Sequence, residues 1–530
     1  MTKPKVIVAE RVADKGLEIL KQELDVDVRF GIKQAELLEI IENYDALIVR
    51  SVIQVNEELL ERAKRLKVVG RAGTGTDNIN VPACTRRGVL VVNTPESNTI
   101  SAAEHTIGLL LSCIRHIPRA TRQLKDGGWD RTPFKGIELY GKTVGIVGLG
   151  RIGSMVAVRL ASFGMKVLAY DPYIPDERFR RFGAEKVTDL NELVRRSDVI
   201  TVHCPRTEET MGMIGEEQFK IAKRGVVVVN CARGGIINEA ALIKAMNEGI
   251  VYSAGIDVFE KEPSPGNPIF QLENIAVTPH CGADTVEAQD RVGVTIAQQV
   301  IRALKGEIVP NAVNLPTLRE EELAGLMPYL CLAEKMGKVY FQMEKAPVER
   351  VELTFRGRVA QMDTEMITVS FLKGLLEPIM GEEVNYVNAG LLAESRGIKL
   401  LVSKEENGSL EFVSLLESKV FSQRGGAVEV AGTLSARKEP RLVMVNGYET
   451  DINPTGHMLF VENIDRPGII GLFGTLLGKH NVNIAMMQVG RKEKGEVALM
   501  TLNVDSPVDE SVIKELRALD GIKSVKTVNF

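Results

Sequence analysis

Residues 143–153 read TVGIVGLGRIG, and this stretch decides the fold of the sequence around it. A short apolar strand, Thr143–Val147, runs directly into the motif GLGRIG, which opens a helix. The glycines permit a tight turn and let the backbone approach a pyrophosphate, which the free N–H groups of the helix N-terminus attract. Asp171 ends the next strand, where its carboxylate can accept hydrogen bonds from an adenine-ribose diol and repel a 2′-phosphate. The pattern therefore predicts a dinucleotide-binding turn that prefers NAD.

The sequence on both sides of this turn alternates short apolar strands with helices. Further strands are expected at Lys166–Tyr170, Val199–Val202, Val226–Asn230, Ser253–Ile256 and Ile275–Val277. Six strands with intervening helices match a doubly wound parallel sheet. The N-terminal segment, which begins with a strand at Lys5–Val8, alternates in the same way and indicates a second parallel sheet covered on both faces. A single long helix is expected from Ser101 to about Lys125.

The pattern changes after Val309–Leu318, which resembles a linker because it carries two prolines and two asparagines without a clear period. The middle block mixes helices and strands, and Lys399–Ser403 and Leu410–Leu416 are expected to pair around Asn407-Gly408. The last stretch, from Met458 to Val528, is expected to run strand, helix, strand, strand, helix, strand, which is the ferredoxin-like order. These patterns predict an α+β domain followed by a βαββαβ domain.

Composition excludes several classes of protein. At 530 residues the chain is too long for one hydrophobic core, and 66 basic against 70 acidic residues leave a formal net charge of −4. A near-balanced chain has no global reason to bind nucleic acid or an anionic membrane. No apolar run reaches the roughly 18 residues of a membrane span, and the N-terminus does not resemble a secretory signal. Six scattered cysteines without a CxxC pair favour buried thiols in a cytoplasmic protein over disulfides or a metal site.

Three polar residues follow successive strands of the predicted dinucleotide domain, at the edge where chemistry is expected. Arg233 can hold a carboxylate in a bidentate fork. His280 can take a hydroxyl proton near neutral pH. Glu262, beside the imidazole, would orient it and raise its pKa. Together these residues favour hydride transfer from a 2-hydroxy acid to NAD.

These residues resemble the D-isomer-specific 2-hydroxyacid dehydrogenases, as do the motifs GRAGTGTDNI at residues 70–79 and TPESN at residues 94–98. The terminal βαββαβ module is similar to an ACT domain, so the chain resembles the long members of the family, which oxidise 3-phospho-D-glycerate on the route to L-serine. The resemblance implies two doubly wound parallel-sheet domains, with the NAD domain inserted in the substrate domain. The implied boundaries are 1–96 plus 285–316 for the substrate domain, 97–284 for the NAD domain, 317–453 for an α+β intervening regulatory domain and 457–530 for the ACT domain.

The resemblance also implies roles for individual residues. The catalytic set is Arg233, Glu262 and His280. The NAD contacts are Thr74, Gly148, Gly150, Arg151, Ile152, Gly153, Asp171, Cys204, Cys231, Ala232, Arg233, Asp257, His280, Gly282 and Ala283, with Asp257 on the nicotinamide carboxamide. The substrate contacts are Arg50, Ser51, Arg71, Ala72, Gly73, Asn98 and Arg131. Arg50 and Arg71 each end a strand that faces the inferred crevice, whereas Arg131 is expected to reach a neighbouring subunit's site.

Regulation is expected at the C-terminal end. Asp465 and Asn483 are predicted to bind L-serine between paired ACT modules, because one edge of the ACT sheet is expected to be free for pairing. A second contact around the helix predicted from Ser101 to Lys125 would make a homotetramer. Two alternatives stay open: a glyoxylate or hydroxypyruvate reductase, and a non-enzymatic NAD-sensing protein like the co-repressors that share this fold.

Overall fold

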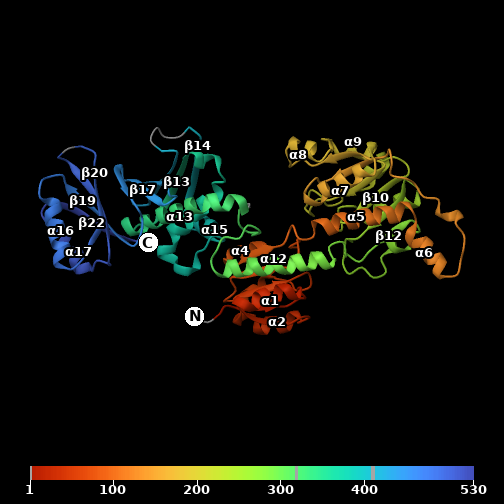
Figure 1. The fold of residues 1–530 in the computed structure, drawn as a ribbon, viewed down its shortest axis with the longest axis horizontal. Helices are drawn as coiled ribbons and strands as arrows, with labels where there is room; N and C mark the ends of the chain where they lie inside the picture. Colours follow the sequence, from red (N-terminus) through yellow and green to blue (C-terminus); the bar gives the residue numbers. More distant parts are fainter. Residues whose placement is uncertain (1–2, 317–319, 408–411, 494) are drawn as a thin grey trace.

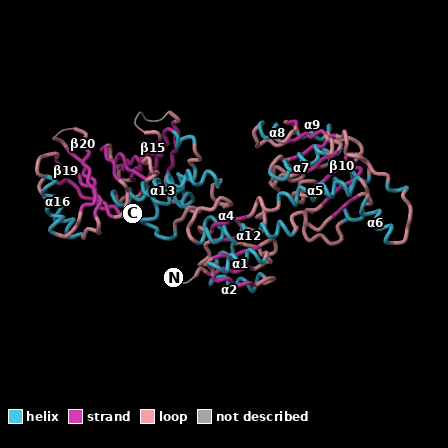
Figure 2. Tube along the Cα trace, in the orientation of Figure 1, coloured by secondary structure: helices cyan, strands magenta, loops and turns pink. Residues whose placement is uncertain are grey.

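Four β-sheets, each covered by its own helices, make up the described part of the chain, residues 3–316, 320–407, 412–493 and 495–530. In this computed structural model the four regions form an elongated arrangement, with the dinucleotide region at one end and the last sheet at the other (Figure 1). Figure 2 shows strands and helices alternating in the two N-terminal regions. The predicted fold class is confirmed by this layout and by the family matches reported below.

The first sheet is built by the N-terminal segment, and all its strands are parallel. Its order is β2-β1-β3-β4-β5, formed by β1 (Lys5–Val8), β2 (Asp25–Val28), β3 (Ala46–Val49), β4 (Val68–Arg71) and β5 (Leu90–Asn93). Its helices are α1 (Asp14–Glu23), α2 (Gln34–Ile40), α3 (Glu57–Arg62) and α4 (Val81–Arg86). A later helix, α12 (Val286–Leu304), returns to this sheet and packs against α1. The approach is so close that a Cβ on Gly16 would stand 2.4 Å from the Gly293 carbonyl oxygen.

The second sheet has seven parallel strands, in the order β12-β11-β10-β9-β6-β7-β8. They are β6 (Thr143–Val147), β7 (Lys166–Tyr170), β8 (Glu185–Lys186), β9 (Val199–Val202), β10 (Val226–Asn230), β11 (Val251–Ile256) and β12 (Ile275–Val277). The predicted six are present, and the two-residue β8 is added at the edge. Its helices are α7 (Arg151–Ser162), α8 (Asp176–Arg181), α9 (Leu190–Arg196), α10 (Glu216–Ile221) and α11 (Glu239–Asn247). The order reverses between β6 and β9, which places the glycine turn at the switch point where ligands bind.

The long helix predicted from Ser101 to Lys125 is two helices, α5 (Thr99–Ile114) and α6 (Ile117–Lys125). The two helices are separated at His116, because its left-handed φ of 54° is incompatible with a continuing α-helix. Its buried ring bonds the Tyr252 hydroxyl through Nε2 at 2.8 Å, and Pro118 stands in the first turn of α6. The single-helix prediction is therefore wrong at this point.

The third sheet is mixed, in the order β14-β13-β15-β16-β17-β18. It comprises β13 (Val348–Gly357), β14 (Lys399–Glu405), β15 (Ser414–Ser422), β16 (Ala427–Leu434), β17 (Pro440–Val445) and β18 (Tyr448–Ile452), with helices α13 (Glu320–Met343), α14 (Glu365–Met380) and α15 (Ala389–Ser395). The hairpin predicted around Asn407-Gly408 is wrong, because β13 lies between the two strands and pairs with β14 in parallel. Part of that prediction, residues 408–411, lies outside the described residues.

The fourth sheet has the order β20-β21-β19-β22 and follows the predicted βαββαβ chain order. Its elements are β19 (His457–Ile464), α16 (Ile469–Lys479), β20 (Ile484–Arg491), β21 (Val497–Val504), α17 (Glu510–Arg517) and β22 (Ile522–Asn529). One face carries the two helices. The other face belongs to the core of the third region, to which it contributes Met458, Phe460, Leu499 and Val528. The two C-terminal regions therefore share a hydrophobic core at this face, whereas the helix-covered face of the fourth sheet has a core of its own.

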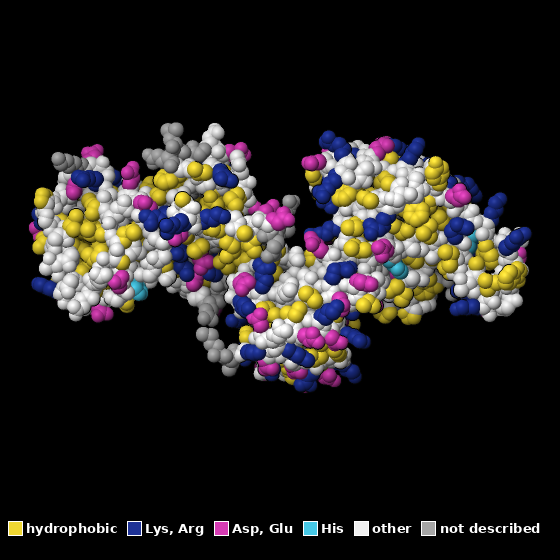
Figure 3. All heavy atoms as spheres, viewed as in Figure 1, with side chains coloured by type: hydrophobic (Ala, Val, Ile, Leu, Met, Phe, Trp, Pro, Cys, Tyr) yellow, Lys and Arg dark blue, Asp and Glu magenta, His cyan; other side chains and the backbone are white. Residues whose placement is uncertain are grey.

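Charged side chains of both signs lie on the surface, and the thiols differ in burial. On the face drawn in Figure 3, basic and acidic side chains are interspersed over the whole molecule, as the near-zero net charge suggests. None of the helices in the described ranges is long and apolar enough to span a membrane. All six cysteines are free; Cys84 and Cys113 are buried, whereas Cys331 is exposed, so the expectation of uniformly buried thiols is wrong. The boundary predicted at residue 317 lies outside the described residues.

Candidate active site

A cavity of about 790 Å³ lies between the first and second sheets and collects most of the predicted site residues. From the first region come Arg50, Ser51, Arg71, Ala72, Gly73 and Thr74. From the second come Asn98, Ile152, Cys231, Arg233, Asp257, Glu262, His280, Gly282 and Ala283. The carboxyl ends of β4 and β10 thus face one crevice, which is large enough for a cofactor head and a small substrate.

The geometry of the glycine turn suits a dinucleotide, and each of its three glycines contributes to that geometry in a different way. Gly148 has a φ of 90°, and a Cβ there would stand 2.8 Å from the His203 carbonyl oxygen. A Cβ on Gly153 would lie 2.0 Å from the Gly148 carbonyl oxygen, so no side chain fits. Gly150 is different, since no atom lies within 4 Å of the Cβ position and the space before the α7 N-terminus is open. The turn is therefore shaped to receive a pyrophosphate.

Asp171 lies at the end of β7, beside this turn. Its Oδ2 accepts the Leu149 N–H at 2.9 Å and its Oδ1 accepts the Tyr173 N–H at 3.1 Å. Arg178, from α8, donates its Nε–H to the Leu149 carbonyl at 3.1 Å, so Leu149 is bonded to both Asp171 and a cation that the sequence reasoning missed. Cys204, whose backbone N lies near Gly148, completes this edge.

His280 and Glu262 form a paired acid–base unit. Glu262 Oε2 lies 2.6 Å from His280 Nδ1, and Glu262 Oε1 accepts the Phe259 N–H at 2.9 Å. The hydrogen bond to Glu262 raises the pKa of His280, although burial opposes it. Burial alone would raise the pKa of Glu262, but the bonds from His280 and Phe259 outweigh it and hold that pKa low. His280 has a left-handed φ of 53°, which non-glycine residues rarely adopt, and its N–H donates to the Asp257 carbonyl at 2.8 Å.

Asp257 is the hydrogen-bond centre of the crevice floor and is 1% exposed. It accepts from the Thr278 hydroxyl at 2.6 Å and from the backbone N–H groups of Cys281 and Gly282 at 2.9 Å each. Burial would raise its pKa, but these bonds and the nearby His105 ring, 3.3 Å away, more than offset that effect and lower it. Although His105, Asp257 and Cys281 lie within metal-ligand reach of one another, both Asp257 oxygens already serve as acceptors.

Of the residues that the structure describes, four arginines line the crevice, namely Arg50, Arg71, Arg206 and Arg233. Arg71 is largely buried, which lowers its pKa to about 10, still well above neutral. Its Nε is buried and has no hydrogen-bond partner among the described residues, while its Nη1 donates to the Ala72 carbonyl at 2.8 Å. Arg233 donates to the Ala232 carbonyl at 2.7 Å and stands 3.4 Å from Asp77. With Arg50 in the same cavity, the site is built for a substrate with more than one negative charge.

Comparison with known proteins identifies the family. Residues 107–282 match the sequence model of the D-isomer specific 2-hydroxyacid dehydrogenase NAD binding domain, residues 325–446 that of the D-3-phosphoglycerate dehydrogenase intervening domain, and residues 457–521 that of the ACT domain. D-3-phosphoglycerate dehydrogenase of Methanocaldococcus jannaschii is 44% identical over 99% of this chain and 100% of its own. The enzyme of Bacillus subtilis is 41% identical over 99% of both chains. The chain belongs to the D-3-phosphoglycerate dehydrogenase family.

Solved structures support the N-terminal half of this assignment. D-lactate dehydrogenase of Aquifex aeolicus, solved with NAD and lactic acid, is 29% identical with a TM-score of 0.52, over 59% of this chain and 100% of that one. A glyoxylate reductase of Paecilomyces thermophila is 28% identical with a TM-score of 0.55, over 59% of this chain and 99% of that one. The D-3-phosphoglycerate dehydrogenase relatives match along the whole chain instead. NAD is thereby confirmed as the predicted cofactor.

Glu10 is a site residue that the sequence analysis missed. Its carboxylate accepts backbone N–H groups from Arg50 at 2.9 Å, Ser51 at 3.1 Å, and Val52 and Ile53 at 3.2 Å each. Glu10 follows β1 and the loop follows β3, so their proximity comes from the pairing of those two strands. No local motif marks such a contact. In this D-3-phosphoglycerate dehydrogenase relative, Glu10 holds the loop that presents Arg50 and Ser51.

Some predicted residues lie outside the cavity. Gly148, Gly150, Arg151 and Gly153 belong to the adjoining glycine turn, and Asp171 and Cys204 lie beside it. Ala232 turns its backbone towards Asn230 and Arg233. Arg131 is exposed on the loop after α6, away from this cavity, so its role towards a neighbouring subunit stays a prediction.

The regulatory pair lies in the ACT domain. Asp465 accepts from Gly495 N–H and pairs with Arg491, each at 3.3 Å. Asn483 donates to Asp505 at 2.7 Å, just before β20. The edge strand β20 lies beside β18 of the same chain, where Gln488 accepts the Asp451 N–H at 2.7 Å. The edge predicted to be free for pairing is therefore partly covered.

Replacing Glu10 with Gln should loosen the Arg50–Ile53 loop, because an amide presents an N–H where the loop also presents N–H groups. We expect KM for the acidic substrate to rise about ten-fold while kcat and KM for NAD change little. Steady-state kinetics measure this split. Glu39→Gln, an exposed change on α2, is the matched control. A fall in kcat at unchanged KM would show that Glu10 does not position the loop.

Replacing Glu262 with Gln should lower the pKa of His280, because the imidazolium loses its charged partner. A base must be unprotonated, so oxidation fails as pH falls through this pKa, and the acidic limb of kcat/KM should move to lower pH with a reduced kcat. The exposed Glu273→Gln variant should keep the original limb. An unmoved limb in Glu262→Gln would remove this carboxylate from the mechanism.

Proposed function

We propose that this protein catalyses the NAD-dependent oxidation of 3-phospho-D-glycerate to 3-phosphooxypyruvate, the first step of L-serine biosynthesis. The observation that carries the proposal is the single crevice that joins Arg50, Arg71 and Arg233 to the His280–Glu262 pair beside the glycine turn. The full-length similarity to D-3-phosphoglycerate dehydrogenases supports the same substrate. The proposed domain boundaries are those implied by the sequence, at residues 97, 285, 317 and 457.

The residues of the crevice have distinct tasks in this reaction. Arg233 holds the carboxylate next to the reacting carbon, and Arg50 and Arg71 hold the phosphate with Ser51, Asn98 and the Ala72–Gly73 backbone. His280 accepts the C2 hydroxyl proton, and Glu262 fixes the ring orientation and stabilises the imidazolium that forms. NAD, when bound, would supply the nicotinamide ring that takes the C2 hydrogen with its electron pair, as a hydride. Asp257, fixed by its bonds to Thr278, Cys281 and Gly282, would hold the carboxamide of that ring.

The charged residues of the crevice distinguish this function from the two alternatives, a glyoxylate or hydroxypyruvate reductase and a non-enzymatic NAD sensor. A glyoxylate reductase acts on a small unphosphorylated acid, for which Arg50 and Arg71 would have no second anion to bind. A non-enzymatic NAD sensor would not need the bonded His280–Glu262 pair. An NADH absorbance assay with 3-phospho-D-glycerate and unphosphorylated 2-hydroxy acids tests the proposal. Preference for an unphosphorylated acid would overturn it.

The ACT domain indicates an amino-acid effector. We propose that this effector is L-serine, held between two ACT modules by Asp465 and Asn483, in a homo-oligomer that is at least a dimer. Because serine would bind far from His280, its effect would be a shift between domain arrangements and not competition. The core shared by the ACT sheet and the intervening domain gives a route for that shift. It also makes truncation before β19 a poor test, since the cut would expose apolar residues.

Replacing Asp171 with Asn removes the negative charge but keeps an oxygen for the Leu149 N–H. With Arg178 close by, we expect the ratio of kcat/KM for NAD over NADP to fall about ten-fold, because the repulsion of a 2′-phosphate is lost. Asp176→Asn, on the exposed start of α8, is the control. An unaltered ratio would place cofactor discrimination elsewhere.

Replacing Asp465 with Asn should raise the serine concentration for half inhibition at least about ten-fold, because the ammonium loses its charged partner. Dehydrogenase activity without serine should stay the same. Asp520→Asn, which breaks an exposed ion pair with Arg466 in the same module, should keep serine inhibition. If serine does not inhibit the unaltered enzyme, or inhibits Asp465→Asn equally, the regulatory proposal fails.

A further inference from the structure

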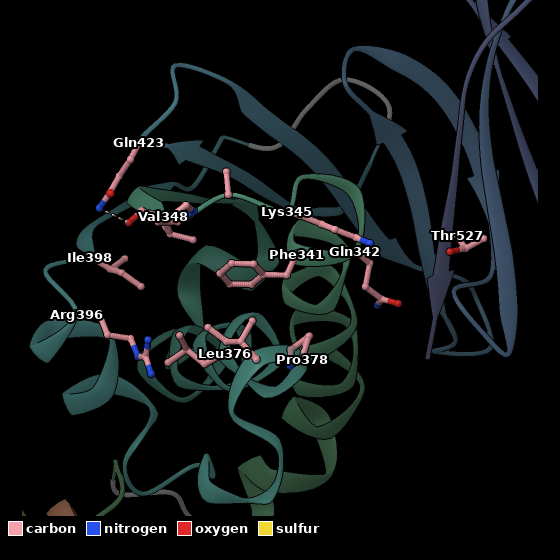
Figure 4. Close-up of a pocket in the computed structure, with 13 residues that line it drawn as sticks. Phe341, Gln342, Lys345, Val348, Leu376, Pro378, Arg396, Ile398, Gln423 and Thr527 are labelled. Carbon is pink, nitrogen blue, oxygen red and sulfur yellow. Dashed lines mark hydrogen bonds between the residues drawn. The ribbon is translucent and has the colours of Figure 1, made fainter. Parts of the chain in front are cut away.

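A second cavity, of about 740 Å³, lies in the intervening domain where it meets the last strand of the ACT domain (Figure 4). It is separate from the crevice and from Asp465 and Asn483, since none of its lining residues belongs to those sites. Its volume lies in the range of small-molecule pockets.

The walls of this cavity are apolar and come from separate elements. Phe341 projects from α13 into the middle, with Val348 of β13 above it and Leu376 of α14 below it in the view of Figure 4. Ile398, just before β14, closes one side. Val348, Leu376 and Ile398 are fixed in the domain core, so the cavity is built on packed elements and not on a loop. Such walls suit an aromatic or aliphatic body.

Two cations, Lys345 and Arg396, stand at the rim, and no acidic side chain lines the cavity. Both are exposed, and within the described ranges neither forms an ion pair. Figure 4 places them on opposite sides of the Phe341 ring, with Lys345 on the Thr527 side. Cations that flank an apolar floor without a neutralising acid favour a ligand that is negative at both ends.

The side of the cavity at Thr527 is also where the intervening domain contacts the ACT domain. Gln342 donates to the Asn529 carbonyl at 3.1 Å and accepts the Asn529 N–H at 2.8 Å, which ties α13 to β22. Gln342 and Pro378 line both this cavity and the larger one that faces the substrate domain. A molecule in the cavity would therefore touch the connection between the ACT domain and the rest of the enzyme.

We propose that this cavity is a binding site for an elongated dicarboxylate with an apolar middle. The apolar body covers Phe341 between Val348 and Leu376, one carboxylate meets Lys345 near Thr527, and the other meets Arg396. The site is independent of the proposed dehydrogenase chemistry.

Isothermal titration of the full-length protein with 1,4-phenylenediacetate tests the proposal. Saturable binding is expected, and Lys345→Gln and Arg396→Gln should each weaken it about ten-fold, because each removes one charge-assisted bond. Arg437→Gln, an exposed arginine outside the cavity, should leave it unchanged. The monoacid 4-methylphenylacetate and the neutral diamide should bind at least about ten-fold more weakly than the diacid.

Each other outcome overturns the proposal. The diacid and the diamide binding equally would exclude a charged site. The diacid and the monoacid binding equally would exclude recognition of both ends. Binding that survives in both cavity variants but disappears in Arg71→Gln would place the probe in the dehydrogenase crevice. Because no turnover is measured, none of these results bears on the oxidation of 3-phospho-D-glycerate.

Discussion

The crevice exists because the chain crosses between the first two sheets twice and the two crossings are bonded to each other. The first crossing enters α5, and the second leaves β12 for α12. Ser101 and Thr285 hydroxyls meet at 2.8 Å, and Arg291 donates to the Ser97 carbonyl at 3.0 Å. These bonds hold the carboxyl ends of two parallel sheets opposite each other. If the two domains close over a substrate, these bonded segments are the hinge about which they rotate.

The dinucleotide region was predictable because its signals are local. A strand, a glycine motif, a helix and a terminal Asp171 occur within thirty residues of sequence, roughly one βαβ unit. The carboxyl ends of parallel strands lie at one edge of a sheet, so the sequence alone predicts that Arg233, Glu262 and His280 lie close together. The bonded pair at 2.6 Å agrees with that reasoning.

The features that escaped prediction depend on distant partners. Glu10 acts on a loop forty residues later, and only the pairing of β1 with β3 brings them together. The break at His116 depends on Tyr252, which comes from β11. The sequence Asn407-Gly408 is typical of a tight hairpin turn. However, β14 pairs in parallel with β13, which lies between β14 and β15. In each case the outcome depends on a tertiary contact, which the neighbouring residues in the sequence do not reveal.

The charges of the crevice favour a substrate with two anionic groups over a substrate with one. Burial lowers the pKa of Arg71, and repulsion from Arg50 and Arg233 lowers it further. Glu10 and Asp77 offset part of that repulsion, but Glu10 is already occupied with four N–H groups. The buried Arg71 Nε has no partner among the described residues. A substrate with a carboxylate and a phosphate would neutralise this set at two points, so the arginines favour a substrate with two anionic groups over a simple 2-hydroxy acid.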